Sequence, residues 1–370
     1  MTVNSSDELP LKIFWELDAG SSFDCTHCRS TEDPAAGDCV MEPAVARELI
    51  EQIAKFKQPR VEFFCSEVSE GVFELVERAA KKEIKVAARF STTASLTEAN
   101  LKKFKAAGGR QAVVLLDSPE AVSNDKLRGE EGYFKAVVEA GKITGEIDLP
   151  LKVVSVLSSN NQHLLAELML MVDVLNPEIW QPFFLVPEVT ESELRLPNTY
   201  EIRQLFLQLY ELTKEVDFKV EVAEAPTYRR YSIERFLWQQ GINPGEKFKR
   251  GALLKPTDIL KKLPGDHSLN SEDWGVNSGR GLIYINSCGE VYPDRFLPVK
   301  CGDLGEKSLS EIYREAPLMK KLKTPGAFKT KCVKNGCWAR FICGGSRARG
   351  YHYTGDPLGT DPLCFYAALE

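Results

Sequence analysis

The first structural unit of the chain reads LKIFWEL (11–17), then PAVARELIEQIAKF (43–56), then VEFFC (61–65). The first and last of these runs are short, apolar and aromatic, which is typical of buried strands. The middle run repeats apolar residues three and four positions apart, which is typical of an amphipathic helix. A strand, a helix and a second strand in this order predict a βαβ unit, whose two strands lie parallel in one sheet.

The same alternation continues to residue 222. Further strand-like runs are IKVAARF (84–90), AVVLLD (112–117), LKVVSVL (151–157), IWQPFFLV (179–186) and FKVEV (218–222), and helix-like runs separate them. About six repeats predict an α/β fold with parallel strands buried on both faces. They favour an incomplete barrel or an open doubly wound sheet, and in both folds the functional residues lie at the carboxyl ends of the strands.

The texture of the sequence changes after residue 225. Pro, Gly and Lys are scattered through 244–268, and a hairpin-like run, GLIYINSCGEVYPDRF, follows at 281–296. We therefore predict a βα barrel region at 1–225, a linker region at 226–274 and a small loop-rich module at 275–370. Small modules of this kind need a staple such as a bound metal.

Charge and hydropathy exclude several classes of partner. The formal net charge is −6 and is dispersed along the 370 residues, so no basic stripe indicates nucleic acid or an anionic membrane. The N-terminus has no basic region followed by a long apolar core, and no later apolar run approaches the length of a membrane span. We expect a cytoplasmic protein with neither nucleic acid nor membrane as a partner.

The ten cysteines fall into two groups. A reducing cytosol disfavours disulfides, so an excess of thiols indicates metal binding or chemistry. One group lies near the start of the chain and the other near its end: Cys25, Cys28, Cys39 and Cys65, then Cys288, Cys301, Cys332, Cys337, Cys343 and Cys364.

The last four cysteines form the strongest metal-binding pattern. Gaps of four, five and twenty residues separate Cys332, Cys337, Cys343 and Cys364, so three thiolates can converge from one loop while the fourth returns from the tail. The glycines at 344 and 345 allow the backbone to approach a bulky inorganic core closely. The spacing admits a 4Fe–4S cluster, a zinc site or buried free cysteines.

Several stretches resemble one known family. The tail CWARFICGGSRARGYHYTGDPLGTDPLC (337–364) closely resembles the C-terminal extension called SPASM in radical-SAM maturases, particularly the haem-biosynthesis-like branch. Similar stretches run along nearly the whole chain: IFWEL (13–17), HCRS (27–30), LRGEEGYFKAV (127–137), WQPFFLVP (180–187) and EAPTYRR (224–230).

The resemblance implies a fold and a chemistry. It implies a partial (βα)6 radical-SAM-type barrel with a small SPASM-like iron–sulfur module that holds a 4Fe–4S cluster. The family cleaves S-adenosylmethionine reductively at a second 4Fe–4S cluster in the barrel, and it uses the resulting radical on a peptide or a tetrapyrrole.

The chain departs from the family at the S-adenosylmethionine site. The family motif CxxxCxxC keeps its second pair as Cys25 and Cys28, but Ser21 stands in place of the first cysteine, and a hydroxyl is a poorer ligand for cluster iron. The family motif GGEP, which grips the methionine amino group, is replaced by SEVS at 66–69, after Cys65.

Three interpretations of the N-terminal cysteines remain open. In the first interpretation Cys39 and Cys65 join Cys25 and Cys28 in a fully thiolate-ligated cluster or zinc site, which would have no open iron. In the second interpretation Cys39 and Cys65 are small buried residues, and the first site is empty or weak. In the third, a catalytic cluster is retained with Ser21, Asp24 or another residue as an unusual ligand.

These departures favour a diverged, non-catalytic iron–sulfur protein, which serves as an electron-transfer or binding partner of another protein, such as a catalytic radical-SAM enzyme or an electron donor. The alternative is an active maturase that uses S-adenosylmethionine with an unusually ligated N-terminal cluster. A zinc-stapled structural scaffold is a third hypothesis, and it predicts a colourless protein.

Residues outside the tail cysteines are also candidates. Glu224, Tyr228 and Arg229 follow the last barrel strand, so they are expected either to contact substrate or cofactor or to form a structural corner. Cys288 and Cys301 resemble the first cysteines of a second auxiliary cluster. Arg347 stands where the family has a later ligand, which favours buried thiols or an interface pair at these two positions.

Overall fold

The computed structural model describes residues 9–18, 39–56, 59–66, 68–186, 195–247 and 275–367. Its core is a curved sheet of parallel strands in sequence order, with each strand hydrogen-bonded to the next. The strands are β1 (Lys12–Glu16), β2 (Arg60–Cys65), β3 (Lys85–Phe90), β4 (Gln111–Leu115), β5 (Leu151–Leu157), β6 (Ile179–Phe184) and the short β7 (Lys219–Val220). The predicted α/β fold with a partial (βα)6 barrel is confirmed.

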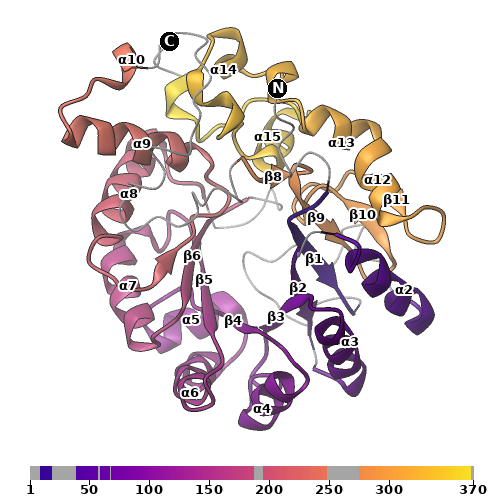
Figure 1. Cartoon of the computed structure of the whole chain (residues 1–370). Helices are drawn as coiled ribbons and strands as arrows, with labels where there is room; N and C mark the ends of the chain where they lie inside the picture. The colour runs from indigo at the N-terminus through magenta and orange to yellow at the C-terminus, as the bar shows by residue number, and fades with distance from the viewer. Residues whose placement is uncertain are drawn as a thin grey trace.

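Helices connect these strands and cover the outside of the curve (Figure 1). In α3, for example, Val72, Phe73, Val76 and Ala79 recur at helical spacing and are buried against the sheet. The connecting helices are α2 (Pro43–Ile53), α3 (Glu70–Lys81), α4 (Glu98–Ala106), α5 (Ala121–Arg128), α6 (Tyr133–Glu146), α7 (Leu165–Val174) and α8 (Thr199–Leu212).

The two faces of the sheet differ in chemistry. On the helix side, Ile13, Trp15 and Phe63 belong to one continuous apolar core. On the inner side, the alternate strand positions carry charged and aromatic residues such as Glu62 and Phe64. The expectation of strands buried on both faces is met, but the inner face mixes charged side chains with apolar ones and encloses a cavity.

The C-terminal segment continues the same sheet. Strand β9 (Gly281–Ile285) pairs parallel with β1, and β10 (Glu290–Tyr292) pairs antiparallel with β9, which forms the predicted hairpin. The short strands β8 (Asn277–Ser278) and β11 (Gly302–Asp303) complete this edge. The helices of the segment are α12 (Leu309–Glu315), α13 (Pro317–Leu322), α14 (Lys331–Lys334) and α15 (Arg347–Thr354).

Within the described residues between β7 and β8, the chain forms the helices α9 (Thr227–Gln239) and α10 (Pro244–Lys247). The buried side chain of Arg349 fastens the tail to the barrel, because it is ion-paired with Asp361 at 2.9 Å and donates to the carbonyl oxygens of Leu185 (2.9 Å) and Glu224. The division of the chain at 225 and 275 remains a prediction.

Among the described residues, no helix has both the length and the apolar character needed to cross a bilayer.

Candidate functional site

The four tail cysteines converge on one small cavity. Cys332 lies in α14, Cys337 and Cys343 flank a short 3₁₀ turn, and Cys364 precedes the final 3₁₀ turn. All four line the same cavity, together with the backbone of Gly344 and Gly345. Both glycines have φ near +70°, a conformation that L side chains rarely adopt, so the sequence Gly-Gly is required for this turn.

Hydrogen-bond donors from several elements reach the tail sulfurs. Arg230 donates through Nη1 to Cys337 Sγ at 3.2 Å, and the Gly345 N–H donates to Cys343 Sγ at 3.4 Å. The hydroxyl of Thr330 lies 3.0 Å from Cys332 Sγ, and that of Thr227 lies 3.7 Å from Cys343 Sγ. Donors of this kind stabilise thiolates that ligate a metal.

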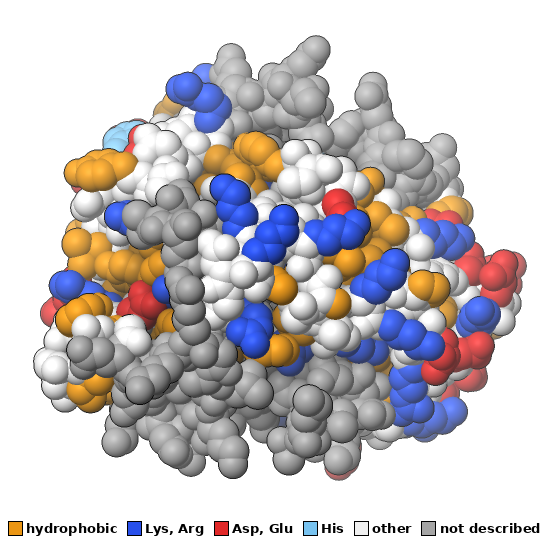
Figure 2. Space-filling model, turned by 90° about the horizontal axis from the view of Figure 1, so that it is seen from above, with side chains coloured by type: hydrophobic (Ala, Val, Ile, Leu, Met, Phe, Trp, Pro, Cys, Tyr) orange, Lys and Arg blue, Asp and Glu red, His pale blue; other side chains and the backbone are white. Residues whose placement is uncertain are grey.

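The tail is strongly basic in a chain that is acidic overall. Residues 316–355 contain six lysines and three arginines and no Asp or Glu. Seen from above, one face of the molecule shows Lys and Arg side chains spread across its middle (Figure 2). A 4Fe–4S cluster ligated by four thiolates would carry net negative charge, and two cations of this segment, Arg340 and Arg347, line the cavity in which it would lie.

The environment of the thiols fits metal ligation better than free thiolates. Burial raises the pKa of Cys343, and it also raises the pKa of Cys337 despite the nearby positive charge of Arg230. A bound metal supplies the charge that lets such buried thiols deprotonate. The donor set fits a 4Fe–4S cluster. Among the described residues, no group of three or more Cys, His, Asp or Glu side chains is arranged to hold a single metal ion.

The N-terminal cysteines are not brought together in the described part of the chain. Cys25, Cys28, Ser21 and Asp24 lie outside the described residues. Cys65 is 4% exposed and packs in the apolar core at the end of β2, where its Sγ lies 3.8 Å from the carbonyl oxygen of Arg89. Burial, with a smaller contribution from Asp18, raises the pKa of Cys65 to about 12. This placement matches the interpretation of Cys65 as a small buried residue.

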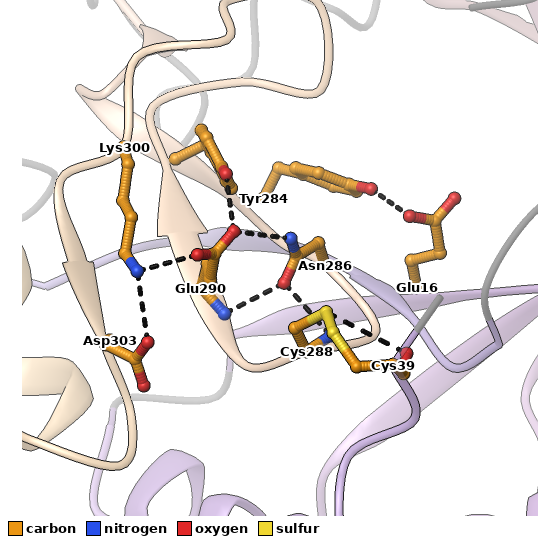
Figure 3. The surroundings of a disulfide bond; sticks show 9 residues. Glu16, Cys39, Tyr284, Asn286, Cys288, Glu290, Lys300 and Asp303 are labelled. Carbon is orange, nitrogen blue, oxygen red and sulfur yellow. Dashed lines mark hydrogen bonds and ion pairs between the residues drawn. A yellow bond between two sulfur atoms is a disulfide. The ribbon is translucent and has the colours of Figure 1, made fainter. Parts of the chain in front are cut away.

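Cys39 forms a disulfide with Cys288, 249 residues away in sequence (Figure 3). The interpretation of Cys39 as a fourth thiolate beside Cys25, Cys28 and Cys65 is therefore corrected, since a disulfide sulfur is not a thiolate ligand. The expected buried thiol at Cys288 is corrected in the same way. The sequence argument missed this pair because a cytosolic chain was expected to keep its thiols reduced.

Hydrogen bonds hold the hairpin side of this disulfide (Figure 3). Asn286 Oδ1 accepts from the backbone N–H groups of Cys288 (3.1 Å) and Glu290 (2.9 Å), and the Glu290 carboxylate is ion-paired with Lys300 at 2.6 Å. The disulfide thus joins the segment before α2 to the turn between β9 and β10. Cys301 stays a free, half-buried thiol, and burial raises its pKa to about 12.

A second cavity, of about 190 Å³, lies inside the barrel. Its wall combines rings and guanidinium groups: the Arg89 guanidinium lies 4.1 Å from the centre of the Phe64 ring, and that of Arg295 lies 5.1 Å from it. The rings of Phe183 and Phe296 pack at 5.2 Å on the same cavity. Carboxylates, among them those of Glu16, Asp18 and Asp294, line the same cavity, so the wall is mixed in charge and suits a ligand that has both an apolar body and polar groups.

Three charged side chains meet inside the barrel, and one of them, that of Arg89, lines this cavity. Glu62 on β2 is ion-paired with Arg89 on β3 at 2.6 Å and with Lys152 on β5 at 2.9 Å. Burial by itself would raise the pKa of Glu62, but the positive charges of Lys152 and Arg89 outweigh it and lower this pKa to about 2. The triad orients Arg89 at the cavity wall.

The three candidates after the last barrel strand separate in the structure. Glu224 and Arg229 line the barrel cavity, whereas Tyr228 is fully buried with its ring 5.1 Å from that of Phe206. The burial of Tyr228 favours the structural-corner alternative for this residue. Burial raises the pKa of Glu224 although Arg349 opposes it, and the Ser346 hydroxyl donates to the Glu224 carboxylate.

Glu224 and Arg229 also connect the cavity to the tail. Arg229 donates to the carbonyl oxygens of Ile342 (2.9 Å) and Val276 (3.0 Å). Glu224 has φ of +52°, an uncommon conformation for a residue with a side chain, and such residues cluster at functional sites. The segment 224–230 therefore contacts both cavities.

At the end of β2, where the family carries its glycine pair, a different arrangement is present. The Asp18 carboxylate accepts hydrogen bonds from the backbone N–H and the hydroxyl of Ser66, both at 2.8 Å. This pairing joins the ends of β1 and β2. Any ligand that binds here meets an anionic serine–aspartate pair in place of a glycine turn.

The charged residues inside the barrel were not among the candidates predicted from the sequence. Glu62, Arg89 and Lys152 were included in the strand-like runs VEFFC, IKVAARF and LKVVSVL. A signal was present, because a charged residue within each of three strand-like runs is unusual for a sheet that is apolar on both faces. Arg230 lies within EAPTYRR (224–230). Its contact with Cys337 spans 107 residues, so no local sequence pattern indicates it.

Comparison with known proteins gives matches along the whole chain. No family model matches it. It is 28% identical over 363 residues to the AdoMet-dependent heme synthase of Methanosarcina barkeri, covering 96% of this chain and 97% of that protein. It is 22% identical over 374 residues to the PqqA peptide cyclase of Rhodopseudomonas palustris, covering 98% of this chain and 88% of that protein.

Solved structures share the fold. Two crystal structures of Streptococcus suis SuiB, one of them bound to S-adenosylmethionine, superpose with TM-scores of 0.69 and 0.68 at 14% and 13% identity. The match covers 96% of this chain and 77% and 75% of those chains.

Proposed function

The chain is homologous to the radical-SAM/SPASM enzymes of haem and peptide maturation, and from this premise we propose that it is itself an iron–sulfur enzyme that acts on a tetrapyrrole or a peptide. The observation that carries the proposal is the convergence of four cysteines from 332–364 on one cavity, directly beside a barrel whose interior holds a second cavity.

In this proposal the tail cysteines hold a 4Fe–4S cluster. The turn at Gly344 and Gly345 lets the backbone come close, and the basic segment 316–355 balances the negative charge. A 4Fe–4S cluster, when bound, supplies one-electron transfer. The segment 224–230 contacts both this site and the barrel cavity, so the two sites form one structural unit.

The barrel cavity is the proposed substrate site. Arg229 and Arg295 present positive charge at its wall, and Phe64 and Phe296 present ring faces. A tetrapyrrole carboxylate or an acidic peptide would bind its anionic groups at the arginines and its apolar portion on the rings. S-adenosylmethionine, when cleaved reductively in this family, supplies the radical.

The choice between an N-terminal cluster with an open iron and one with four thiolate ligands depends on Cys39 and Cys65. A closed site needs four thiolates, but Cys39 is in a disulfide, and Cys65 is a buried thiol at the end of β2 that belongs to the apolar core and borders the barrel cavity. Cys25 and Cys28 then keep an incomplete thiolate set, as an S-adenosylmethionine-binding cluster requires, with Ser21 or Asp24 as the proposed further ligand.

A second candidate function is the non-catalytic partner in electron transfer or binding. It is favoured by Ser21 in place of the first motif cysteine and by the Asp18–Ser66 pair in place of the glycine turn. The zinc scaffold differs from both candidates in colour, since thiolate-bound iron–sulfur clusters are brown and zinc sites are colourless.

The test is the iron and sulfide content per chain after anaerobic reconstitution, followed by an assay of 5′-deoxyadenosine formation with dithionite as the reductant. Three variants are compared with the parent: Cys25→Ala/Cys28→Ala, Cys337→Ala, and Cys301→Ala as a control thiol outside both sites. The proposal expects about eight irons in the parent and the control, about four in each of the other two, and 5′-deoxyadenosine from the parent.

Other outcomes select the alternatives. About four irons in both the parent and the Cys25→Ala/Cys28→Ala variant, without 5′-deoxyadenosine, would leave the non-catalytic partner. A colourless parent that contains zinc would leave the structural scaffold.

A further inference from the structure

Arg230 links a barrel helix to one of the tail cysteines. It lies in the first turn of α9, and its Nη1 donates to Cys337 Sγ at 3.2 Å. Its Nε donates to Glu234, one turn further along the same helix, at 2.8 Å. The guanidinium therefore bridges a carboxylate and a cysteine sulfur.

The position of this guanidinium is fixed from three parts of the chain. It lies 3.6 Å from the centre of the Tyr366 ring and 5.8 Å from that of Trp338. Glu234 in turn accepts hydrogen bonds from the Tyr366 hydroxyl (2.7 Å) and from Trp338 Nε1 (3.3 Å). The side chains of Arg230 and Glu234 are only 14% and 16% exposed, so this geometry is held by packing.

We propose that Arg230 is a positioning residue that sets the reduction potential of the iron–sulfur cluster held by the tail cysteines. This inference rests on the proposed function, which places a cluster at these thiols. On reduction the cluster would gain one electron from the reductant, and no bond would form or break. Its sulfurs would therefore become more negative. A fixed cation that donates a hydrogen bond to one sulfur stabilises the reduced form more than the oxidised form.

The neighbouring donors differ from Arg230 in charge. Thr227, Thr330 and the Gly345 N–H also contact tail sulfurs, but they are neutral. Hydrogen bonds that involve a charged group are roughly twice as strong as neutral ones. Arg230 also borders an open surface groove together with Trp238 and Asn243, so solvent partly screens its charge.

These considerations give the size and sign of the effect. Replacing Arg230 by methionine removes one charge-assisted hydrogen bond and should lower the equilibrium constant for one-electron reduction about tenfold. For one electron, a tenfold change corresponds to a potential lower by about 59 mV. Removing the negative charge of Glu234, with Glu234→Gln, should shift the potential in the opposite direction.

The experiment uses the full-length chain in the Cys25→Ala/Cys28→Ala background, so that only the tail cluster is titrated. After anaerobic reconstitution and iron analysis, the potential is measured by dithionite titration monitored by electron paramagnetic resonance. Arg235→Met is the matched control, because Arg235 lies on the same helix and pairs with Glu211 at 3.3 Å, and its replacement removes the same charge. We expect less than a twofold change in the reduction constant for this control.

The results separate the inference from the function on which it rests. Full iron content and the parent potential in both Arg230→Met and Arg235→Met would overturn the role of Arg230 and leave the cluster in place. If Arg230→Met fails to retain iron, the reduction potential is measured in Arg230→Lys and Glu234→Gln instead. An unshifted potential in Glu234→Gln overturns the inference. Absence of iron from the background protein would mean that the proposed cluster itself is wrong.

Discussion

The buried triad inside the barrel makes stability depend on pH in a calculable way. Glu62 is paired with Arg89 at 2.6 Å and with Lys152 at 2.9 Å, and its pKa is about 2 instead of the ordinary 4.5. The perturbation is Glu62→Gln, which keeps the shape of the side chain and removes its charge. At pH 7 it should destabilise the fold by about 3–5 kcal/mol, because two cations stay buried without their carboxylate.

The sign follows from the direction of the pKa change. A carboxyl group with a lowered pKa in the folded state contributes stability in full above its unfolded pKa, and it loses that contribution as the pH falls through the folded pKa. The difference between 4.5 and about 2 corresponds to about 3.4 kcal/mol at pH 7. About two fifths of this contribution, roughly 1.4 kcal/mol, remains at pH 3.

The assay is urea unfolding of the metal-free parent and Glu62→Gln, followed by tryptophan fluorescence at pH 7 and pH 3. The gap in unfolding free energy between the two proteins should narrow by about 2 kcal/mol at the lower pH. Glu77→Gln, which breaks an exposed helical pair with Lys81, is the control and should follow the parent at both pH values. An equal gap between parent and Glu62→Gln at pH 7 and pH 3 would refute the electrostatic argument.

Three further outcomes are expected. Arg349→Met should destabilise the chain by about 3–5 kcal/mol in urea unfolding, because it breaks the fully buried ion pair with Asp361 inside the tail and the hydrogen bonds to the barrel carbonyl oxygens of Leu185 and Glu224; a loss below 1 kcal/mol would contradict that role. Gly345→Ala should cost about 1–3 kcal/mol at its φ of +70° and reduce iron retention, whereas Gly145→Ala, with open space around it in α6, should not destabilise. Peptide mapping without reductant should recover Cys39 linked to Cys288, and Cys39→Ser should lower the unfolding free energy by about 2–5 kcal/mol; two free thiols in the parent would contradict the pairing.

Local patterns predicted the fold well. The alternation of apolar runs with period-3.6 runs predicted the order of β1–β7 and their helices, because each element buries its own apolar side and records that burial in its own sequence. The hairpin at 281–296 was predicted on the same basis. Its position, parallel to β1 at the edge of the barrel sheet, was not predicted, since no local pattern encodes the partner of an edge strand.

The candidate site was likewise predicted from the sequence only in part. The spacing of Cys332, Cys337 and Cys343 indicated a shared site, because a few residues of loop suffice to bring three such side chains together. The predicted grouping of Cys39 with Cys65 was wrong, because closeness in sequence does not by itself bring two side chains together. Proximity in sequence did not prevent one side chain from packing in the core and the other from pairing with Cys288.

The sequence by itself determined the βα alternation, the hairpin and the tail cysteine set, all of which depend on neighbours within a few residues. Only the tertiary structure decided that Glu62 meets Lys152, that Cys39 meets Cys288 and that Arg230 meets Cys337. Each of these contacts joins residues 90 or more positions apart. Such contacts depend on how the elements pack around the barrel and its tail, and that packing is a property of the whole chain.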